Sequence, residues 1–396
     1  MYIFYIYIKG EMTMKKTRII AIMTIIALCF SSFVGCGKAE EEKYVIGVSG
    51  PLTGGAAMYG QAVQNSAQMA IDEINAAGGL NGVKFELVAT DDQHDPTKVS
   101  TNYASMLEKG MQVSLGTVTT GPGLEFKKLS KEDNVFFLTP SASGDDVPEF
   151  DNGYQMCFAD SNQGAVAATY VNENYKGETI GIFYKKDDAY SRGIYDQFVA
   201  NLDPSIKTVE SLFTDANATD FVAQIGELKA CQFIFMPIYY TPASIFMTQA
   251  KDIMAADTIY YGCDGFDGIE NAEGFKIDEI PQEIIMLSHF NSKATDGLAK
   301  EYIDKYTKAY KDEPLNQFGA SAYDCVYAIY NAMKAAVDAG KEIPVDITAS
   351  DLCEILKEQF QDGFTFTGVT GENIQWDETG YVQKGAVQYV IKEATK

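Results

Sequence analysis

A regular alternation of strand-like and helix-like segments begins at Tyr44 and continues through most of the chain. "YVIGVSG" is an apolar strand that ends in glycine, and "YGQAVQNSAQMAIDEINAAGG" then has apolar residues at helical spacing and stops at Gly78 and Gly79. "VKFELVATDD" returns as a strand, after which Asp95 and Pro96 are suited to open a helix. "MQVSLG", a helix from about Leu124 and "NVFFLTP" continue the series. This alternation is typical of a parallel, doubly wound α/β sheet.

A second series of the same kind starts near Gln163. Its strands and helices have the lengths and apolar spacing of the first series. The strands are expected in "ETIGIFY", in the segment from Lys207, in "QFIFMP" and in "DTIYYG". The helices are expected in "GAVAATYVNENY" and in the segments from Ser191, Thr219 and Ala243. The C-terminal part adds further elements: a strand in "EIIMLSHF", helices near 294–310, 317–339 and 350–359, and a hairpin turn at 377–380. The 396 residues therefore predict two similar α/β halves, each large enough for its own core.

The N-terminus has the pattern of an export signal. Three basic residues precede an apolar run at 19–30: Lys15, Lys16 and Arg18. The run has the length of a signal-peptide core and is too short to span a bilayer comfortably, although an uncleaved membrane anchor stays open as an alternative. Met14, or Met12, places the basic residues at the usual distance from a start, so residues 1–13 are interpreted as an upstream mis-start or a dispensable extension.

The apolar run is followed by "SSFVGCGKAEEE", which is similar to a bacterial lipobox. Cys36 follows a small residue, but Phe33 stands where leucine is usual. We therefore predict a signal peptide at 1–35, lipidation of Cys36 and a short polar linker at 36–43. In either interpretation the protein is exported and tethered to the extracytoplasmic face of a bacterial membrane.

Composition excludes several functional classes. The formal net charge of −24 opposes binding to nucleic acid, whose affinity for proteins comes mainly from lysine and arginine on phosphates. Five cysteines remain beyond the signal and the lipidated residue, and they are scattered without a CxxC pair: Cys157, Cys231, Cys263, Cys325 and Cys353. Such a set is neither a disulfide framework nor a zinc site, so we expect buried, apolar thiols.

The loops after the strands are the places to search for a ligand, because open α/β sheets bind ligands outside the carboxyl ends of their strands. In the first half these loops are "GPLTGGAAMYG", "GTVTTGPG" and "TPSASGDD", which offer hydroxyl groups and backbone N–H groups at helix starts. Both suit a carboxylate. In the second half "YKKDDAYSRG", "MPIYYTPAS" and "YGCDGFDG" offer aromatic rings and acids. The combination fits a small zwitterion with an apolar side chain.

Motifs for catalysis are missing. The chain has only two histidines, His94 and His289, and no GxSxG, HExxH, phosphate-loop or dinucleotide motif follows a strand. "DDQHD" at 91–95 has the look of a metal site, but Asp95 with Pro96 fits a helix cap better, since metal sites need more convergent ligands. We therefore expect no enzyme, no metal and no cofactor.

Several separate motifs in order resemble the type I extracellular solute-binding lipoproteins of ABC importers, in the leucine/isoleucine/valine-binding branch. The resemblance extends over essentially the whole mature chain. It begins with the stretch from "VIGVSGPLTGG" to "DDQHDP" and continues through "GTVTTGP", "TPSAS", "PIYYTPAS", "GCDGFDG", "QFGASAYDCVYA" and "GENIQWDETG". It implies two Rossmann-like lobes joined by three crossovers, with an amino acid enclosed between them and no catalysis. The expected division is 44–160 with 288–364 for one lobe and 161–287 with 365–396 for the other.

The resemblance also implies the ligand contacts. Thr119 and Thr120 match the loop that grips the α-carboxylate, and Ser141 and Ser143 match the next loop, which contacts both the carboxylate and the ammonium. Asp264 matches the acid that pairs with the α-ammonium, where some relatives have glutamate.

The aromatic residues of the pocket are carried over in the same way. Tyr59 matches a wall of the side-chain pocket, and Tyr190 and Tyr239, with Tyr240 less closely matched, match lids from the second lobe. From the residues alone, the hydroxyls could be ordinary turn groups, the tyrosines packing residues and Asp264 a turn or capping acid.

Three further residues are interpreted as structural. Asp267 is expected to cap the short helix that follows it. Tyr323 and Asp324 match a helix near the hinge, and we read both as residues that hold the fold.

As function, the resemblance implies capture of an amino acid, in the first place a branched-chain aliphatic one, by hinge closure. The partners would be the membrane subunits of a permease with a separate ATPase, and the protein is expected to be a monomer. A sensory lipoprotein of the same fold, a binder of amides, urea or aromatic acids, and a hydrolase on an α/β scaffold stay open as alternatives. The last lacks a nucleophile with a paired base.

Overall fold

The computed structural model describes residues 42–311 and 313–395. The chain divides into a unit at 1–42 and a compact unit at 43–396, and the description concerns the second. The predicted signal peptide and Cys36 lie outside the described residues. Within those residues, each helix is either too short or too polar to cross a bilayer.

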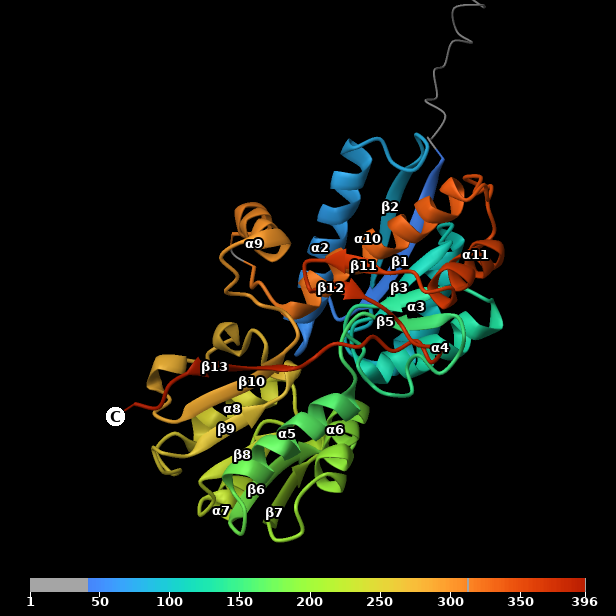
Figure 1. Cartoon of the computed structure of the whole chain (residues 1–396). Helices are drawn as coiled ribbons and strands as arrows, with labels where there is room; N and C mark the ends of the chain where they lie inside the picture. The colour runs from blue at the N-terminus through green and yellow to red at the C-terminus, as the bar shows by residue number, and fades with distance from the viewer. Residues whose placement is uncertain (1–41, 312, 396) are drawn as a thin grey trace, which may run out of the picture. The chain divides into compact units, whose positions relative to one another are not determined.

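Lobe 1 is built on a parallel sheet of five strands in the order β2-β1-β3-β4-β5. The strands are β1 (Lys43–Gly50), β2 (Lys84–Asp91), β3 (Val113–Thr117), β4 (Phe137–Thr139) and β5 (Gly153–Gln155). Its helices are α2 (Ala57–Ala76), α3 (Val99–Glu108), α4 (Thr120–Glu132), α10 (Gln317–Asp338) and α11 (Ala349–Gln361). α2 and α10 lie side by side although they are far apart in the sequence (Figure 1).

Lobe 2 is built on a sheet of six strands in the order β13-β10-β9-β8-β6-β7. The strands are β6 (Thr179–Lys185), β7 (Lys207–Phe213), β8 (Phe233–Met236), β9 (Ile259–Gly262), β10 (Glu283–Ser288) and β13 (Val387–Lys392). All pairs are parallel except β10 with β13, which is antiparallel. The helices that follow lobe 2 strands or precede them are α5 (Asp160–Asn174), α6 (Ala189–Ala200), α7 (Val222–Leu228) and α8 (Tyr240–Ala250).

The remaining elements of the described chain are five short 3-10 helices, one further α-helix and a small pair of strands. The 3-10 helices are η1 (Pro96–Lys98), η2 (Asp215–Asn217), η3 (Asp264–Phe266), η4 (Ile269–Asn271) and η5 (Ile277–Glu279). Helix α9 (Gly297–Ala309) follows β10, and a small antiparallel pair, β11 (Phe366–Gly368) with β12 (Gly371–Ile374), follows α11. As predicted, the carboxylate of Asp95 caps the turn that Pro96 opens, by accepting from the N–H of Thr97.

The described chain passes between the two sheets three times: from β5 to β6, from β10 to α10, and from β12 to β13. On the third passage, the indole of Trp376 donates to the carbonyl of Gln155 in β5 at 2.6 Å, and the predicted turn closes between Asp377 and Gly380. The residues near that turn therefore contact lobe 1. The division of the sequence between the lobes stays a prediction.

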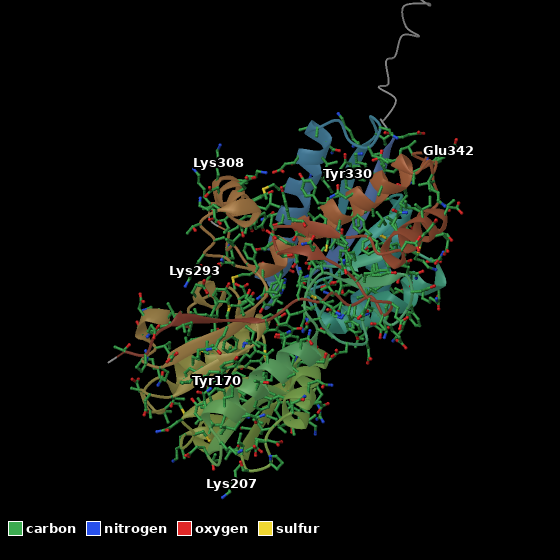
Figure 2. The ribbon with its side chains drawn as sticks, in the orientation of Figure 1. Tyr170, Lys207, Lys293, Lys308, Tyr330 and Glu342 are labelled. Carbon is green, nitrogen blue, oxygen red and sulfur yellow. The ribbon has the colours of Figure 1, made fainter. Side chains whose placement is uncertain are left out.

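Apolar side chains fill both lobes. One cluster fills one face of lobe 1, including Phe126 and Phe137, and another fills one face of lobe 2, including Phe198 and Phe235. The largest cluster continues from lobe 1 into lobe 2. Charged side chains such as those of Lys207, Lys308 and Glu342 are exposed and project outward from the ribbon (Figure 2). The five cysteines are free and buried, as expected.

Candidate functional site

The sequence-predicted site residues all lie at the carboxyl ends of strands or at the start of the next helix. Thr119 and Thr120 begin α4 after β3, and Ser141 and Ser143 follow β4. In lobe 2, Tyr190 begins α6, Tyr239 precedes α8 and Asp264 follows β9. Tyr59 comes from the first turn of α2. Because parallel strands end at the same edge, the folding of each sheet brings these loops together.

Asp264 is buried and only half satisfied. Its Oδ1 accepts a hydrogen bond from the hydroxyl of Tyr190 at 2.6 Å, and that hydroxyl accepts from the N–H of Gly265 at 2.9 Å. Gly265 must be glycine here, since a Cβ would lie 2.6 Å from the carbonyl of Ile238. The other oxygen, Oδ2, has no hydrogen-bond partner among the described residues. Burial raises the pKa of Asp264 to about 6, because the charged form is costly in a dry environment.

A second acid, Asp160, lies close to Asp264 and was not predicted. It is 1% exposed, and neither of its carboxylate oxygens has a hydrogen-bond partner in the described part of the chain. Its pKa is raised well above the ordinary value, first by burial and next by the negative charge of Asp264. Two buried acids without a cation are unstable in their charged forms. A positively charged group placed between them would relieve both.

Further unpaired polar atoms belong to the same region. Gln163 is fully buried and accepts from the backbone N–H of Asp264 at 3.0 Å, while its amide nitrogen has no partner within the described residues. The hydroxyl of Ser143 faces the carboxylate of Asp160 without a hydrogen bond of normal geometry, and the hydroxyl of Tyr239 is buried and unpaired there too. Buried polar groups are rarely left unpaired in folded proteins, so this cluster is suited to a polar ligand.

Aromatic rings form one wall of the site. The rings of Tyr190 and Tyr239 stack at 4.6 Å with 13° between their planes. The ring of Tyr59 lies 5.8 Å from Tyr239 and 4.6 Å from Phe318. The hydroxyl of Tyr59, from lobe 1, donates to the carbonyl of Gly265 in lobe 2 at 2.5 Å. The wall therefore spans both lobes and has its polar edge directed toward the acids.

Two of the predicted hydroxyl groups in the loops of lobe 1 are already hydrogen-bonded to the backbone. Thr120 Oγ1 accepts from the N–H of Gly144 at 3.2 Å, and Ser141 Oγ donates to the carbonyl of Val118 at 2.6 Å. Both side chains therefore hold the loops together. The start of α4 has no side-chain cap, which leaves its first N–H groups suited to an anion.

The contact made by Asp267 differs from the helix cap expected from the sequence. Its Oδ2 accepts from the N–H of Gln317 at 2.8 Å, so it binds the start of α10 and not the short helix that follows it. That short helix, η4, is preceded by Gly268, whose φ of 91° suits glycine. Burial raises the pKa of Asp267 to about 7. The carboxylate joins the acidic loop of lobe 2 to a helix of lobe 1, a link that sequence spacing could not indicate.

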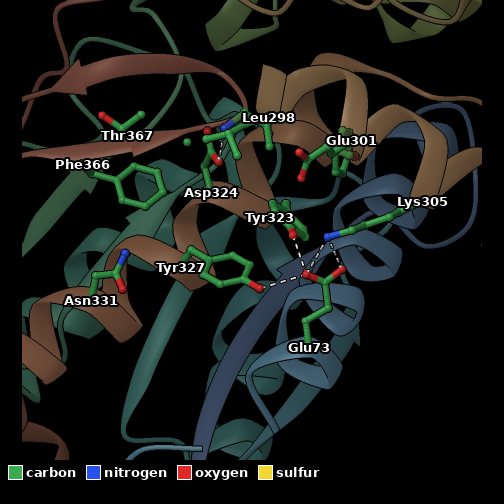
Figure 3. Close-up of a pocket in the computed structure, with 13 residues that line it drawn as sticks. Glu73, Leu298, Glu301, Lys305, Tyr323, Asp324, Tyr327, Asn331, Phe366 and Thr367 are labelled. Atoms are coloured by element: carbon green, nitrogen blue, oxygen red, sulfur yellow. Dashed lines mark hydrogen bonds and ion pairs between the residues drawn. The ribbon is translucent and has the colours of Figure 1, made fainter. Parts of the chain in front are cut away.

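A separate cavity of about 260 Å³ lies beside α10 (Figure 3). Glu73 accepts there from the hydroxyls of Tyr323 and Tyr327 at 2.7 and 2.9 Å and from the ammonium of Lys305 at 3.0 Å. Asp324, at the rim, accepts from the N–H groups of Val369 and Thr370 at 2.8 Å each. Because these acids are satisfied by the chain itself, we assign the cluster to the support of α10. In the described residues, no set of three acids, histidines or cysteines is arranged to hold a metal ion.

Comparison with known proteins identifies the family. The sequence matches the family described as periplasmic binding protein over residues 43–395. It is 28% identical to a leucine-, isoleucine-, valine-, threonine-, and alanine-binding protein of Pseudomonas aeruginosa over 375 residues, or 93% of each chain. It is 30% identical to the Leu/Ile/Val-binding protein BraC3 of Rhizobium johnstonii over 320 residues, which cover 76% of this chain and 85% of that protein.

A solved structure agrees with this. The fold is similar to that of the branched-chain amino acid transporter substrate binding protein LivJ of Streptococcus pneumoniae, solved in complex with isoleucine. The TM-score is 0.77 and the identity 26%, and the match covers 88% of this chain and 98% of that one. The predicted fold of two α/β lobes is therefore confirmed. The chain belongs to the periplasmic binding protein family, whose members are binding proteins of ABC transporters and not enzymes.

Proposed function

We propose that this protein captures an α-amino acid, in the first place a branched-chain aliphatic one, between its two lobes and delivers it to an ABC importer. The observation that supports this most strongly is the pair of buried acids, Asp160 and Asp264, with unpaired oxygens beside stacked tyrosine rings. An α-ammonium group would donate hydrogen bonds to the unpaired oxygens of both acids, balance the negative charge of one of them and meet the electron-rich faces of the rings. No buried lysine or arginine contacts these two acids within the described residues, so the ligand is the expected source of the charge.

The carboxylate of the ligand would be held on the lobe 1 side. The uncapped start of α4 presents N–H groups, and the unpaired hydroxyl of Ser143 lies in the next loop. Thr120 and Ser141 would shape these loops, because their side chains already bond to the backbone. The side chain would lie toward Tyr59 and Phe318, an apolar surface that favours aliphatic groups.

Binding would proceed by hinge closure. The ligand would first contact lobe 1, and lobe 2 would then close and exclude water, which strengthens each charged contact. Contacts that cross between the lobes, such as Thr241 Oγ1 to the carbonyl of Gly55 at 2.6 Å, would form in that step. X-ray scattering that shows no compaction when a ligand binds would contradict the closure.

The remaining parts of the proposal concern location and partners. We propose that Cys36 carries a lipid that anchors the protein outside the membrane, and that a permease with a separate ATPase accepts the closed form. By their descriptions, the Pseudomonas aeruginosa relative binds leucine, isoleucine, valine, threonine and alanine, the Rhizobium johnstonii relative binds Leu/Ile/Val, and LivJ was solved with isoleucine, which supports the choice of ligand. A sensory role of the same site, and ligands such as amides, urea or aromatic acids, remain the alternative hypotheses.

The test is a thermal-shift screen of the purified protein against the twenty amino acids, urea, short amides and benzoate. A ligand present at a hundredfold excess over its Kd should stabilise the protein by about 2.7 kcal/mol, which gives a clear shift of the melting temperature. We expect shifts with leucine, isoleucine or valine and none with urea. A shift with an uncharged amide and with no α-amino acid would keep the binding fold and overturn the proposed ligand.

A further inference from the structure

The start of helix α8 in lobe 2 and the start of helix α2 in lobe 1 contact each other directly. The hydroxyl of Tyr240, the first residue of α8, accepts from the N–H of Met58 in the first turn of α2 at 3.4 Å. In the opposite direction, the N–H of Tyr240 donates to the hydroxyl of Tyr59 at 3.3 Å. The two tyrosine rings meet edge-on, with centroids 5.0 Å apart and 88° between their planes. A tyrosine of each lobe therefore bonds to the helix start of the other lobe.

These contacts replace the caps that both helices lack. The first N–H groups of an α-helix have no partner within the helix, and a side chain at the N-cap usually accepts from one of them. The N-cap residues are Ala56 for α2 and Tyr239 for α8, and in the described chain neither side chain accepts a hydrogen bond from its helix. The hydroxyls of Tyr240 and Tyr59 take this role from the facing lobe. The two helices are therefore capped reciprocally, and only while the lobes are closed.

Two further hydrogen bonds extend the contact between the lobes. Thr241 Oγ1 donates to the carbonyl of Gly55, in the loop before α2, at 2.6 Å. The hydroxyl of Tyr59 donates to the carbonyl of Gly265 in lobe 2 at 2.5 Å. We call these two bonds and the two reciprocal caps the clasp. Each of its hydroxyl groups bonds to the backbone of the opposite lobe, so the clasp does not depend on which ligand lies in the site.

Lobe 1 holds its half of the clasp in place. Asp91, at the end of β2, accepts from the hydroxyl of Thr53 at 2.6 Å, which fixes the loop that carries Gly55. Gly60 allows α2 to pack closely onto the same loop, since a Cβ there would lie 2.3 Å from the carbonyl oxygen of Pro51. Because the groups of lobe 1 are already ordered, closure of lobe 2 onto them costs little additional conformational entropy.

We propose that Tyr240 and Thr241 are positioning residues that set, through the clasp, how long the closed form lasts, and that their hydroxyls do not contact the amino acid. Since the clasp forms only on closure, the loss of one of its bonds shifts the protein toward the open form by the same factor for every ligand. The net contribution of one hydrogen bond corresponds to roughly a threefold to tenfold change in an equilibrium constant. This proposal rests on the proposed function of capture by closure.

The experiment measures binding and release of the amino acids that stabilise the purified protein in the screen, expected to be leucine, isoleucine and valine. Tyr240→Phe and Thr241→Val each remove one hydroxyl and keep the shape of the side chain. For each variant we expect titration calorimetry to show all dissociation constants raised roughly fivefold, with their ratios unchanged. Release of the radiolabelled amino acid into an excess of the unlabelled one should be faster by the same factor, because the clasp forms after the ligand has entered.

Each variant has a matched control with the same substitution. Tyr310→Phe removes a hydroxyl that donates to the carbonyl of Asn65 in α2 at 3.0 Å. Thr248→Val removes a hydroxyl that donates to the carbonyl of Ser244 in α8 at 2.7 Å. The first bond joins the end of α9 to α2 and the second lies within α8, so neither belongs to the clasp. Both controls should release the amino acid at the rate of the unsubstituted protein.

A release rate equal to that of the unsubstituted protein in either Tyr240→Phe or Thr241→Val would overturn the proposal. A lower melting temperature without ligand, found together with that unchanged rate, would mark a purely structural role. Weaker affinity for one amino acid with unchanged affinity for the others would also overturn it, since the hydroxyl would then contact the ligand. Failure of the unsubstituted protein to bind any amino acid of the screen would instead overturn the proposed function.

Discussion

Replacement of Asp264 by asparagine is expected to weaken amino acid binding by roughly 30-fold to several thousand-fold. The carboxylate is 2% exposed, and one of its oxygens has no partner among the described residues. A ligand ammonium at this oxygen would form a charge contact shielded from water, which is strong because competing solvent is absent. The asparagine side chain has nearly the same shape, so it removes the charge and little else. Titration calorimetry with leucine gives the two dissociation constants.

The same Asp264→Asn variant should be at least as stable as the unsubstituted protein when no ligand is present. Without ligand, Asp264 is a buried charge near Asp160, so its removal should leave the melting temperature unchanged or raise it. Asp267→Asn is the matched control, because Asp267 is a buried acid in the same loop that is directed at α10. It should retain the affinity of the unsubstituted protein. Equal affinities for Asp264→Asn and the unsubstituted protein would contradict the assignment of the ammonium site.

Asp324→Ala is expected to lower the free energy of unfolding by about 3–5 kcal/mol, the largest effect on stability that we predict. Asp324 accepts from two backbone N–H groups and from the hydroxyl of Thr370, which in turn accepts from the ammonium of Lys384 at 2.6 Å. The pKa of Lys384 is lowered to about 8 by burial, and Asp324 opposes this shift. Alanine would leave the two backbone N–H groups and the hydroxyl of Thr370 without their acceptor, and would remove the negative charge that acts on Lys384. Urea unfolding of both proteins measures the loss.

The control for Asp324→Ala lies on the same helix. Asp338, at the end of α10, forms an exposed pair with Lys334 one turn earlier at 2.6 Å. Exposed pairs of this kind contribute little to stability, so Asp338→Ala should unfold at the same urea concentration as the unsubstituted protein. If Asp324→Ala unfolds there too, the network around the third passage does not support the fold.

The alternation of strands and helices was sufficient to predict both lobes, because each buried strand is a continuous apolar run. Several short strands were missed, β5 and β13 among them. β5 is only three residues, "GYQ", and β13 mixes polar and apolar residues in "VQYVIK", as expected of a half-exposed edge strand. The local sequence pattern of each is the same as that of a loop, so neither could be recognised as a strand from the sequence. They exist because a neighbouring strand, β4 or β10, offers a free edge to pair with.

The candidate site was predicted only in part, because some of its contacts depend on residues that are far apart in the sequence. Asp264 and Tyr190, which the resemblance pointed to, do meet through a hydrogen bond. Asp160 was missed because an acid in the first turn of a helix is ordinary, and only its burial against Asp264 makes it unusual. His94 was considered only as one of two histidines without a catalytic motif and within a rejected metal motif. Its contact with Asp188, at 3.4 Å between Nε2 and a carboxylate oxygen, joins two loops of different lobes, and sequence spacing contains no information on such a pair.

The most direct test of the account compares leucine with two analogues that each lack one charge. 4-Methylpentanoate lacks the ammonium, and leucinamide lacks the carboxylate. If the buried acids and the start of α4 hold the two ends of a zwitterion, calorimetry should show leucine binding at least about a hundredfold more tightly than either analogue, since each loses a charge contact shielded from water. Equal binding of leucine and 4-methylpentanoate would contradict the account, because the two acids would then have no cation to receive.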